Sequence, residues 1–246
     1  MRLTFLGTGS AMAVPDRAQT GLLLEREDRR LLIDCGAGVL QRLAGTDAGY
    51  EGVSTVLLTH HHLDHVADLL PLLKARWLAG EEWLEVVGPR GTKALVDDLL
   101  ATFEYLDGRV DLRVREVGPH EFTVAGFDVR ARETRHSIDG LAYRVAGADG
   151  DLTISSDTEA FEGMAAFADG SSVFVHDCSF PDDVDVSNHP TPSTLGETLA
   201  DHDYGRVYLT HLYPHTEGRH DEMLAAVERR YDGEVRFARD GVRVEC

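Results

Sequence analysis

The stretch Thr59-His60-His61-His62-Leu63-Asp64-His65 begins at the end of a buried strand predicted over residues 53–59 and contains the pattern HxHxDH. Two histidines separated by one residue can point the same way in an extended loop, whereas Asp64 and His65 fall in the first turn of a helix predicted over residues 63–78. The stretch can therefore supply ligands for two metal ions. Imidazole and carboxylate suit Zn²⁺, with Mn²⁺ or Fe²⁺ as weaker alternatives. A solvated polar loop is the less favoured interpretation.

The ending of this strand occurs twice in the chain. Val56-Leu57-Leu58-Thr59-His60 and Val207-Tyr208-Leu209-Thr210-His211 are both apolar runs that end in Thr-His. Similarities of this length also arise by coincidence, but both histidines are of the residue type that binds metal most often. We therefore expect two related halves that place His60 and His211 at a shared edge, with two sheets at the core and helices outside.

The rest of the chain alternates apolar runs with turn signals, which predicts a mixture of strands and helices. Strands are expected over residues 3–6, 21–26, 30–33, 83–87, 110–117, 121–124, 127–132, 141–145, 152–155, 173–175 and 207–209, with a strand pair within residues 233–244. Helices are expected over residues 39–43, 91–105, 194–200 and 221–230.

Acidic residues outnumber basic ones by 43 to 24, which gives a formal net charge of -19. The acids are spread along the chain, so we expect a uniformly acidic, well-hydrated surface of the kind suited to a salt-rich cytoplasm. High salt screens repulsion, so this charge argues only weakly against a polyanionic substrate. The three cysteines form no CxxC pair, and we see no signal-length or membrane-spanning apolar segment, which predicts a cytoplasmic protein without membrane contact. A single α/β domain over residues 1–246 is expected.

Six marks along the chain resemble those of the metallo-β-lactamase-fold hydrolases, in particular the ribonuclease Z-like and small phosphodiesterase branch. The marks are Phe5-Leu6-Gly7-Thr8-Gly9-Ser10, Leu32-Ile33-Asp34-Cys35-Gly36, the HxHxDH segment, His136 before Gly140-Leu141-Ala142-Tyr143, Ser156-Asp157-Thr158 and Leu209-Thr210-His211. The resemblance covers nearly the whole chain. It implies an α/β fold with four layers, an αββα sandwich, whose metal site lies at the shared sheet edge of the two halves.

The resemblance also implies a ligand set for two metal ions, which we expect to be zinc. His60, His62 and His136 would bind one ion, Asp64, His65 and His211 would bind the other, and Asp157 would bridge the two. Taken alone, His136 could be a surface histidine and Asp157-Thr158 could cap a helix. The HxHxDH pattern favours the ligand roles for both.

Four further residues are expected to act beside the metals. Asp34, His176 and Asp177 would orient the ligands. His189 resembles a position that approaches the scissile phosphate and would donate a proton to the leaving oxygen. A plain turn aspartate at residue 34 and a surface loop histidine at residue 189 are the alternatives. The remaining histidines are expected to be exposed and without a role: His61, His120, His202, His215 and His220.

Metal-assisted hydrolysis is the reaction that such a site predicts, with Asp64 as the proton acceptor. The tRNA-processing members of the family usually carry a long insertion where this chain has only residues 137–156. A small cyclic or linear phosphodiester, or a short nucleic acid, is therefore preferred to a tRNA precursor as the substrate. Thioesterase or lactonase activity and a non-catalytic metal-binding role stay open, because one fold hosts many chemistries. We also consider a homodimer formed through residues 92–105.

Overall fold

Two seven-stranded sheets form the centre of the structure, a computed structural model that describes residues 1–246. The first sheet has the order β14-β1-β2-β3-β4-β5-β6, and the second has the order β13-β12-β11-β10-β9-β8-β7. The strands of the first sheet are β1 (Arg2–Gly7), β2 (Gly21–Arg26), β3 (Arg29–Ile33), β4 (Thr55–Leu57), β5 (Trp83–Gly88), β6 (Asp111–Glu116) and β14 (Arg243–Glu245). Those of the second are β7 (Glu121–Val124), β8 (Phe127–Glu133), β9 (Leu141–Val145), β10 (Leu152–Ile154), β11 (Val173–Asp177), β12 (Val207–Thr210) and β13 (Val235–Phe237).

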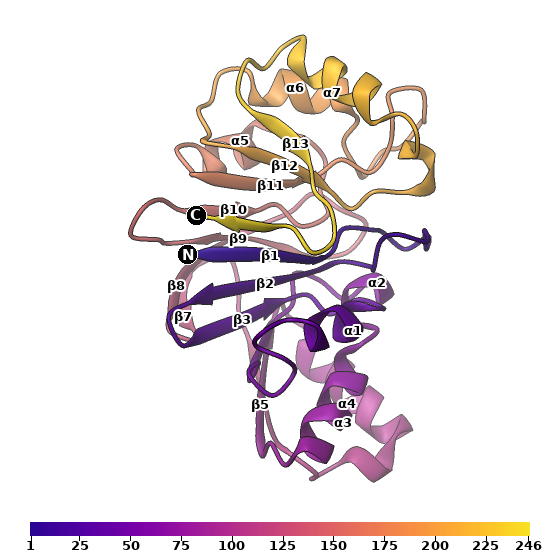
Figure 1. Ribbon diagram of the computed structural model, residues 1–246, viewed down its shortest axis with the longest axis vertical. Coiled ribbons are helices and arrows are strands. Elements are labelled where there is room, and N and C mark those ends of the chain that lie inside the picture. The colour runs from indigo at the N-terminus through magenta and orange to yellow at the C-terminus, as the bar shows by residue number, and fades with distance from the viewer.

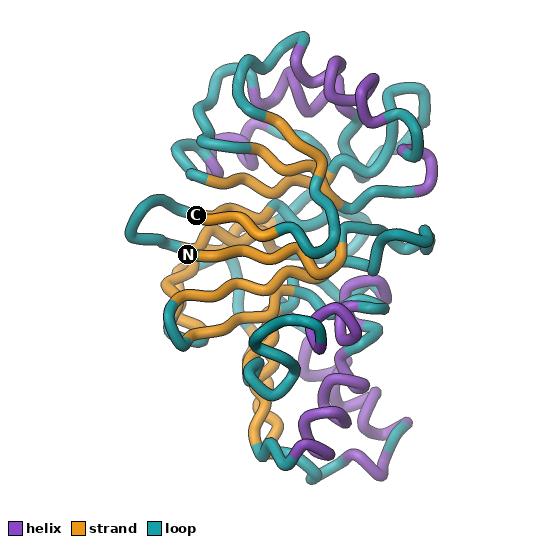
Figure 2. Tube along the Cα trace, in the orientation of Figure 1, coloured by secondary structure: helices purple, strands orange, loops and turns teal.

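Helices cover the outer face of each sheet (Figure 1, Figure 2). The first sheet carries α1 (Val39–Ala44), α2 (Leu63–Val66), α3 (Leu69–Ala79) and α4 (Thr92–Thr102), followed by the 3-10 turn η1 (Glu104–Leu106). The second sheet carries α5 (Glu162–Ala168), α6 (Pro192–Leu199), the 3-10 turn η2 (Pro214–Thr216) and α7 (His220–Glu228). The longest helices, α3 and α4, have 11 residues each, and no helix combines the length and the hydropathy that crossing a membrane requires.

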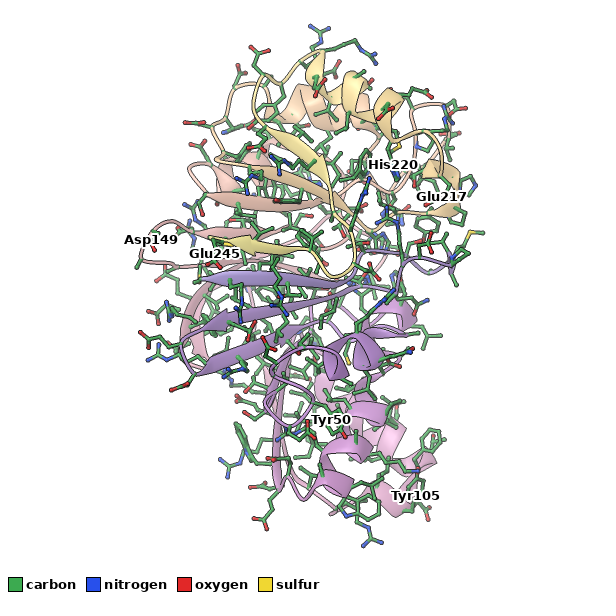
Figure 3. The ribbon with its side chains drawn as sticks, viewed as in Figure 1. Tyr50, Tyr105, Asp149, Glu217, His220 and Glu245 are labelled. Carbon is green, nitrogen blue, oxygen red and sulfur yellow. The ribbon has the colours of Figure 1, made fainter.

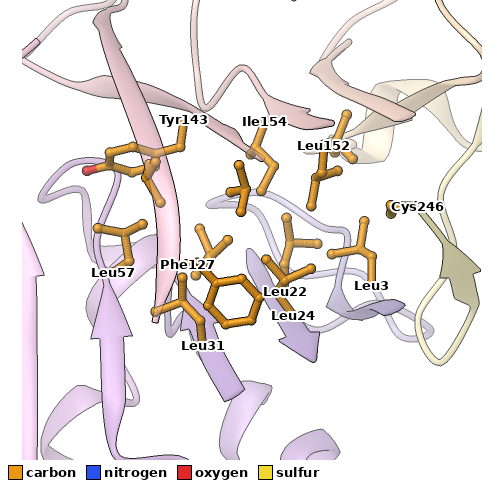
Figure 4. Close-up of a cluster of buried hydrophobic side chains, with 14 of the residues drawn as sticks. Leu3, Leu22, Leu24, Leu31, Leu57, Phe127, Tyr143, Leu152, Ile154 and Cys246 are labelled. Carbon is orange, nitrogen blue, oxygen red and sulfur yellow. The ribbon is translucent and has the colours of Figure 1, made fainter. Parts of the chain in front are cut away.

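Three buried apolar clusters fill the spaces between the layers. Leu22 and Leu24 point into the cluster between the two sheets (Figure 4). Leu23 points the other way, into the cluster between the first sheet and its helices, because successive strand residues face opposite sides. Phe174 belongs to the third cluster, which packs the second sheet against α5, α6 and α7. The resulting order of helix, sheet, sheet and helix confirms the αββα sandwich.

The two related halves are visible in the pairing of the strands that carry the repeated Thr-His ending. β4 pairs in parallel with β3 in the first sheet, and β12 pairs in parallel with β11 in the second. The carboxyl ends of β4 and β12 lead to the predicted ligands His60 and His211, and those of β3 and β11 lead to Asp34 and Asp177. The repeat therefore marks equivalent places in two sheets, as the sequence predicted.

The single helix predicted over residues 63–78 is wrong, because the structure divides it into α2 and α3. The loop after β3 replaces the helical hydrogen bonds at the break: the Asp68 N–H donates to the Cys35 carbonyl (2.9 Å), and the Cys35 N–H donates to the His65 carbonyl (2.7 Å). A Cβ at Gly36 would lie 2.0 Å from the Asp64 carbonyl oxygen, so this close approach requires glycine. The break fixes α2 directly against the loop that contains Asp34.

The strand pair predicted within residues 233–244 is also wrong, since its two strands belong to different sheets. β13 pairs in parallel with β12, whereas β14 pairs antiparallel with β1 and brings the C-terminus beside the N-terminus (Figure 1). An apolar and turn pattern does not reveal which sheet a short strand joins. Helix α5 was missed altogether, because its seven residues span only two turns.

Candidate metal centre

Asp34 anchors the histidine-rich loop that follows β4. Its Oδ1 accepts a hydrogen bond from the Thr59 backbone N–H (2.7 Å), and its Oδ2 accepts one from the Thr59 hydroxyl (2.7 Å). His65 Nδ1 lies 2.7 Å from the same Oδ2 and must be the donor, because an ionised carboxylate only accepts. Asp34 has φ 59°, a left-handed conformation that is strained for a residue other than glycine. This conformation lets one buried carboxylate bind both the loop, through Thr59, and helix α2, through His65.

The first group of potential ligand atoms belongs to His60, His62, His136 and Asp157. His62 Nδ1 lies 3.1 Å from both His60 Nε2 and His136 Nε2. Asp157 Oδ2 lies 3.7 Å from His60 Nε2 and 3.8 Å from His136 Nε2. A tetrahedral Zn²⁺ with Zn–N distances of about 2.0–2.1 Å separates neighbouring ligand atoms by roughly 3.4 Å. The four atoms therefore fit the corners of one tetrahedral metal site.

Hydrogen bonds on the far side of the His60 and His136 rings fix which of their nitrogens is free to bind. His136 Nδ1 lies 3.2 Å from the Asn188 carbonyl oxygen, so it carries the proton and leaves Nε2 with a lone pair. The Thr59 hydroxyl donates its proton to Asp34, so its oxygen can only accept from His60 Nδ1, which lies 3.1 Å away. His60 therefore carries its proton on Nδ1, and its Nε2 is free. Both free nitrogens face His62 Nδ1 at 3.1 Å, so three imidazole nitrogens converge at this point.

The second group consists of Asp64, His65 and His211. Asp64 Oδ2 lies 3.1 Å from His211 Nε2 and 3.8 Å from His65 Nε2. Asp157 again adjoins the group, with Oδ1 at 3.4 Å from His65 Nε2 and Oδ2 at 3.2 Å from His211 Nε2. His65 Nε2 is buried and has no hydrogen-bond partner in the protein, which is the state expected of a nitrogen that binds a metal. Asp157 thus belongs to the first group and lies against the second.

Burial favours the neutral imidazole form that metal ions require. Desolvation lowers the pKa of His60 well below its ordinary value, and it also lowers the pKa of His62 and of His136. Burial opposes charge on His65 as well, but the Asp157 and Asp34 carboxylates outweigh it and raise the pKa of His65 well above the usual range. The negative charge of these carboxylates stabilises a positive charge at His65. A metal ion bound to Nε2 would supply that charge in place of a proton.

His189 stands over the centre and is held by Asp177. Its Nδ1 lies 2.6 Å from Asp177 Oδ2, and its ring stacks on that of His211 with centroids 5.4 Å apart. A third group of closely spaced ligand atoms comprises Asp157, His189 and His211, so a ring nitrogen of His189 reaches the edge of the metal centre. Burial opposes charge on His189, but Asp177 outweighs it and raises the pKa of the imidazole.

Ser179 is a member of the site that the sequence analysis missed. Its hydroxyl donates to Asp177 Oδ1 (2.6 Å) and lies 2.9 Å from His211 Nδ1. Because its proton is used on Asp177, the oxygen accepts from His211 Nδ1 and leaves Nε2 of His211 free for metal. The only sequence signal is a hydroxyl residue two positions after a carboxylate at a strand end. Tyr143, whose buried hydroxyl donates to the Leu58 carbonyl (2.7 Å), was noted only as part of a motif.

His176 does not support the centre as predicted. β11 continues through Asp177, so strand alternation turns Asp177 toward the site and His176 toward the helices. The His176 ring packs on Phe174, with centroids 5.1 Å apart, and its Nδ1 lies 2.7 Å from the Asp177 carbonyl oxygen. His176 is thus a buried core residue.

Three of the five histidines expected to be exposed are half-buried. His61 Nε2 lies 2.8 Å from the Thr92 hydroxyl, and His202 Nε2 lies 3.1 Å from Glu162 Oε1. The ring of His220 stacks on Phe237. His120 and His215 are exposed, as predicted. None of the five falls within the groups of closely spaced ligand atoms.

Comparisons with known proteins agree with this fold. The family model of the Anti-Pycsar protein Apyc1 matches residues 1–241. A ribonuclease Z from Mycobacterium marinum is 30% identical over 274 residues, which cover 100% of this chain and 98% of that protein. The metallo-β-lactamase-fold protein YhfI from Bacillus subtilis superposes with a TM-score of 0.86 at 24% identity, covering 100% of this chain and 99% of that one.

A metal-bound relative shares the fold as well. Zn²⁺-bound PqqB from Methylobacterium extorquens superposes with a TM-score of 0.79 at 18% identity and covers 100% of both chains. At this identity the likeness shows the fold, while the matches over the full length of the chain show the family. The chain belongs to the Anti-Pycsar protein Apyc1 family, among the ribonuclease Z-like hydrolases of the metallo-β-lactamase fold.

Proposed function

We propose that this protein is a dinuclear, zinc-dependent phosphodiesterase that hydrolyses a small cyclic or linear phosphodiester or a short nucleic acid. The observation that carries the proposal is the position of Asp157 between two groups of potential ligands. A pair of divalent cations supplies an activated water and stabilises the negative charge that develops in a phosphoryl displacement. The zinc assignment is supported by the nitrogen and oxygen donor set and by the zinc in PqqB, with Mn²⁺ or Fe²⁺ as alternatives.

The side chains around the centre are suited to move protons. Asp64 is the carboxylate that would take the proton of the attacking water. His189 keeps Nδ1 on Asp177, so its other nitrogen is free to donate a proton to the leaving oxygen. Asp34 and Asp177 hold the imidazoles in the tautomers that these roles need.

The size of the substrate is argued from the segment between His136 and Asp157. Residues 137–156 include β9 and β10, which lie within the second sheet, so no long arm projects from this part of the chain. A small phosphodiester is therefore our first choice. Processing of tRNA 3′ ends is the second, and it is favoured by the 30% identity to a ribonuclease Z.

The test combines metal content with hydrolysis of bis-p-nitrophenyl phosphate, both measured in high salt. About two zinc ions per chain are expected, with activity that is lost in Asp64→Asn and kept in Asp139→Asn, an exposed control near His136. Metal without phosphodiesterase activity, but with cleavage of chromogenic thioesters or lactones, would move the assignment to those substrates. A chain that binds no metal would refute the mechanism.

We also propose that the chain is a single cytoplasmic domain that forms a homodimer through the helices on the first sheet. Its three cysteines are free and buried, which suits a reducing compartment. An apolar groove of about 490 Å³ lies between α3 and α4, and its lining includes Phe103 and Tyr105, which are 44% and 49% exposed. Tyr105 is labelled in Figure 3. Sedimentation should show a dimer that Phe103→Glu dissociates; a monomeric parent chain would contradict this proposal.

A further inference from the structure

Two aromatic side chains stack on each other beside the metal centre. The ring centroids of Phe180 and Tyr213 are 4.4 Å apart, with an angle of 27° between the ring planes. We call this pair the aromatic shelf. Both residues are half-buried.

The register of two neighbouring strands explains why these residues meet. Asp177 of β11 lies opposite Thr210 of β12 in the parallel ladder. Phe180 and Tyr213 each follow three residues later, and the Tyr213 N–H donates to the Ser179 carbonyl at 3.4 Å. The two chains therefore stay side by side beyond the ends of the strands.

The backbone holds the shelf in a fixed conformation. Phe180 precedes Pro181 and Tyr213 precedes Pro214, and a residue before proline is restricted to extended conformations. Tyr213 has φ -79° and ψ 161°, and its carbonyl accepts hydrogen bonds from both the N–H (3.0 Å) and the hydroxyl (2.8 Å) of Thr216. A binding surface that is already ordered loses little entropy when a ligand arrives.

The shelf adjoins the residues that would handle the phosphate. The Tyr213 ring centroid lies 5.6 Å from that of His211 and 6.1 Å from that of His189. The Phe180 ring centroid lies 5.9 Å from that of His189. A planar group attached to a phosphate at the metal centre would thus be within reach of the shelf.

We propose that Phe180 and Tyr213 form a stacking site for the nucleobase of a nucleotide whose phosphate lies at the metal centre. The proposal rests on the proposed phosphodiesterase function. It assigns a binding site to the nucleobase, whereas the metal centre would bind the phosphate. Every nucleobase offers a π-face, and stacking on an aromatic side chain is tolerant of sequence. Since the chain has a formal net charge of -19, stacking adds affinity that its overall charge does not provide.

The test is calorimetric binding of AMP and of ribose 5-phosphate to the zinc-loaded protein, because these ligands share a phosphate and differ by the base. AMP should bind about 5- to 150-fold more tightly, the range that stacking on one aromatic side chain spans. Phe180→Leu and Tyr213→Leu should each reduce this ratio, whereas Tyr213→Phe, which keeps the ring, should preserve it. Equal affinities for the two ligands in the unmodified protein would overturn the proposal.

A matched control comes from a second aromatic pair away from the centre. The rings of Phe237 and His220 stack with centroids 4.2 Å apart and an interplanar angle of 27°. His220 is labelled in Figure 3. Phe237→Leu should leave the ratio unchanged, and an equal loss in this variant would refute a specific role for the shelf. Hydrolysis of bis-p-nitrophenyl phosphate, followed in parallel, reports on the proposed function. A preference for AMP without hydrolysis would uphold the shelf and reject the phosphodiesterase.

Discussion

The two halves of the molecule use the same arrangement of side chains to hold histidines at the centre. In the first half, Asp34 binds the Thr59 hydroxyl, which supports His60, and Asp34 binds His65 directly. In the second half, Asp177 binds the Ser179 hydroxyl, which supports His211, and Asp177 binds His189 directly. Each half thus has one carboxylate, one hydroxyl group and two histidines, placed by a pair of adjacent parallel strands.

The difference lies in the histidine that each carboxylate holds directly. His65 falls into the second ligand group with Asp64 and His211, where its buried Nε2 lacks any other partner. His189 instead stands at the edge of the centre, with its ring stacked on His211. We infer that the first half is specialised for holding metal, whereas the second half holds metal and also presents a proton donor to the substrate.

The largest effect is expected from removing the side chain that joins the halves. Asp157→Asn deprives both ligand groups of an anionic oxygen, so metal affinity and kcat should each fall by more than about 100-fold, beyond the range typical of residues that only orient ligands. Metal analysis after dialysis and hydrolysis of bis-p-nitrophenyl phosphate measure the two quantities. Retention of two metals with full activity would show that the halves do not share this carboxylate.

The next effect tests whether His189 is a proton donor and not a ligand. His189→Asn should lower kcat by about 10²- to 10⁴-fold on a phosphodiester with an alkoxide leaving group, the usual contribution of general acid catalysis. The loss should be much smaller with a p-nitrophenolate leaving group, which departs without protonation, and metal content should not change. His202→Gln is the control, since His202 is half-buried, lies outside the groups of potential ligands and has ring nitrogens 3.1 Å from Glu162 and 3.6 Å from Asp169. Loss of metal in His189→Asn would show that His189 is a ligand like His65, and would contradict the proposed difference between the halves.

The sequence reveals the parts of this arrangement whose residues lie close together along the chain, and it does not reveal contacts between distant segments. His60, His62, Asp64 and His65 lie in one short segment, and the structure brings that segment together with the distant His211. Ser179 was missed because the Thr-His repeat points to Thr210 as the counterpart of Thr59. The hydroxyl that supports His211 instead comes from the neighbouring strand, and local patterns do not show contacts between strands.

Errors in element boundaries have a similar cause. β11 was predicted to end before His176, and its two additional residues decide which of His176 and Asp177 faces the centre. The break between α2 and α3 depends on hydrogen bonds to Cys35, about 30 residues earlier in the chain. Helical spacing of leucines continues across this break, so periodicity alone could not locate it.

A smaller effect should separate the two carboxylates. Asp34→Asn replaces one of the two acceptor oxygens with an amide donor and removes the negative charge. The single remaining oxygen cannot serve both the Thr59 N–H and the pair formed by the Thr59 hydroxyl and His65, so metal affinity should fall by about 10- to 100-fold. Asp177→Asn should reduce metal affinity less, because the carboxylate reaches His211 through Ser179, but it should reduce kcat through His189. Competition with a chelator gives the affinities. Equal losses of metal affinity in both variants would contradict the proposed division of roles.

The smallest effect is expected for Ser179→Ala, which removes the hydroxyl between Asp177 and His211. One neutral hydrogen bond contributes about 0.5–1.5 kcal/mol, so metal affinity should fall by only about 2- to 10-fold. Combining it with Asp177→Asn tests the relay, because the two losses should not add if the carboxylate acts on His211 only through this hydroxyl. Additive losses would mean that Asp177 supports His211 by a second route, such as its 3.9 Å approach to Nδ1. In that case the second half would hold its metal ligand as directly as the first, and the difference between the halves would lie in His189 alone.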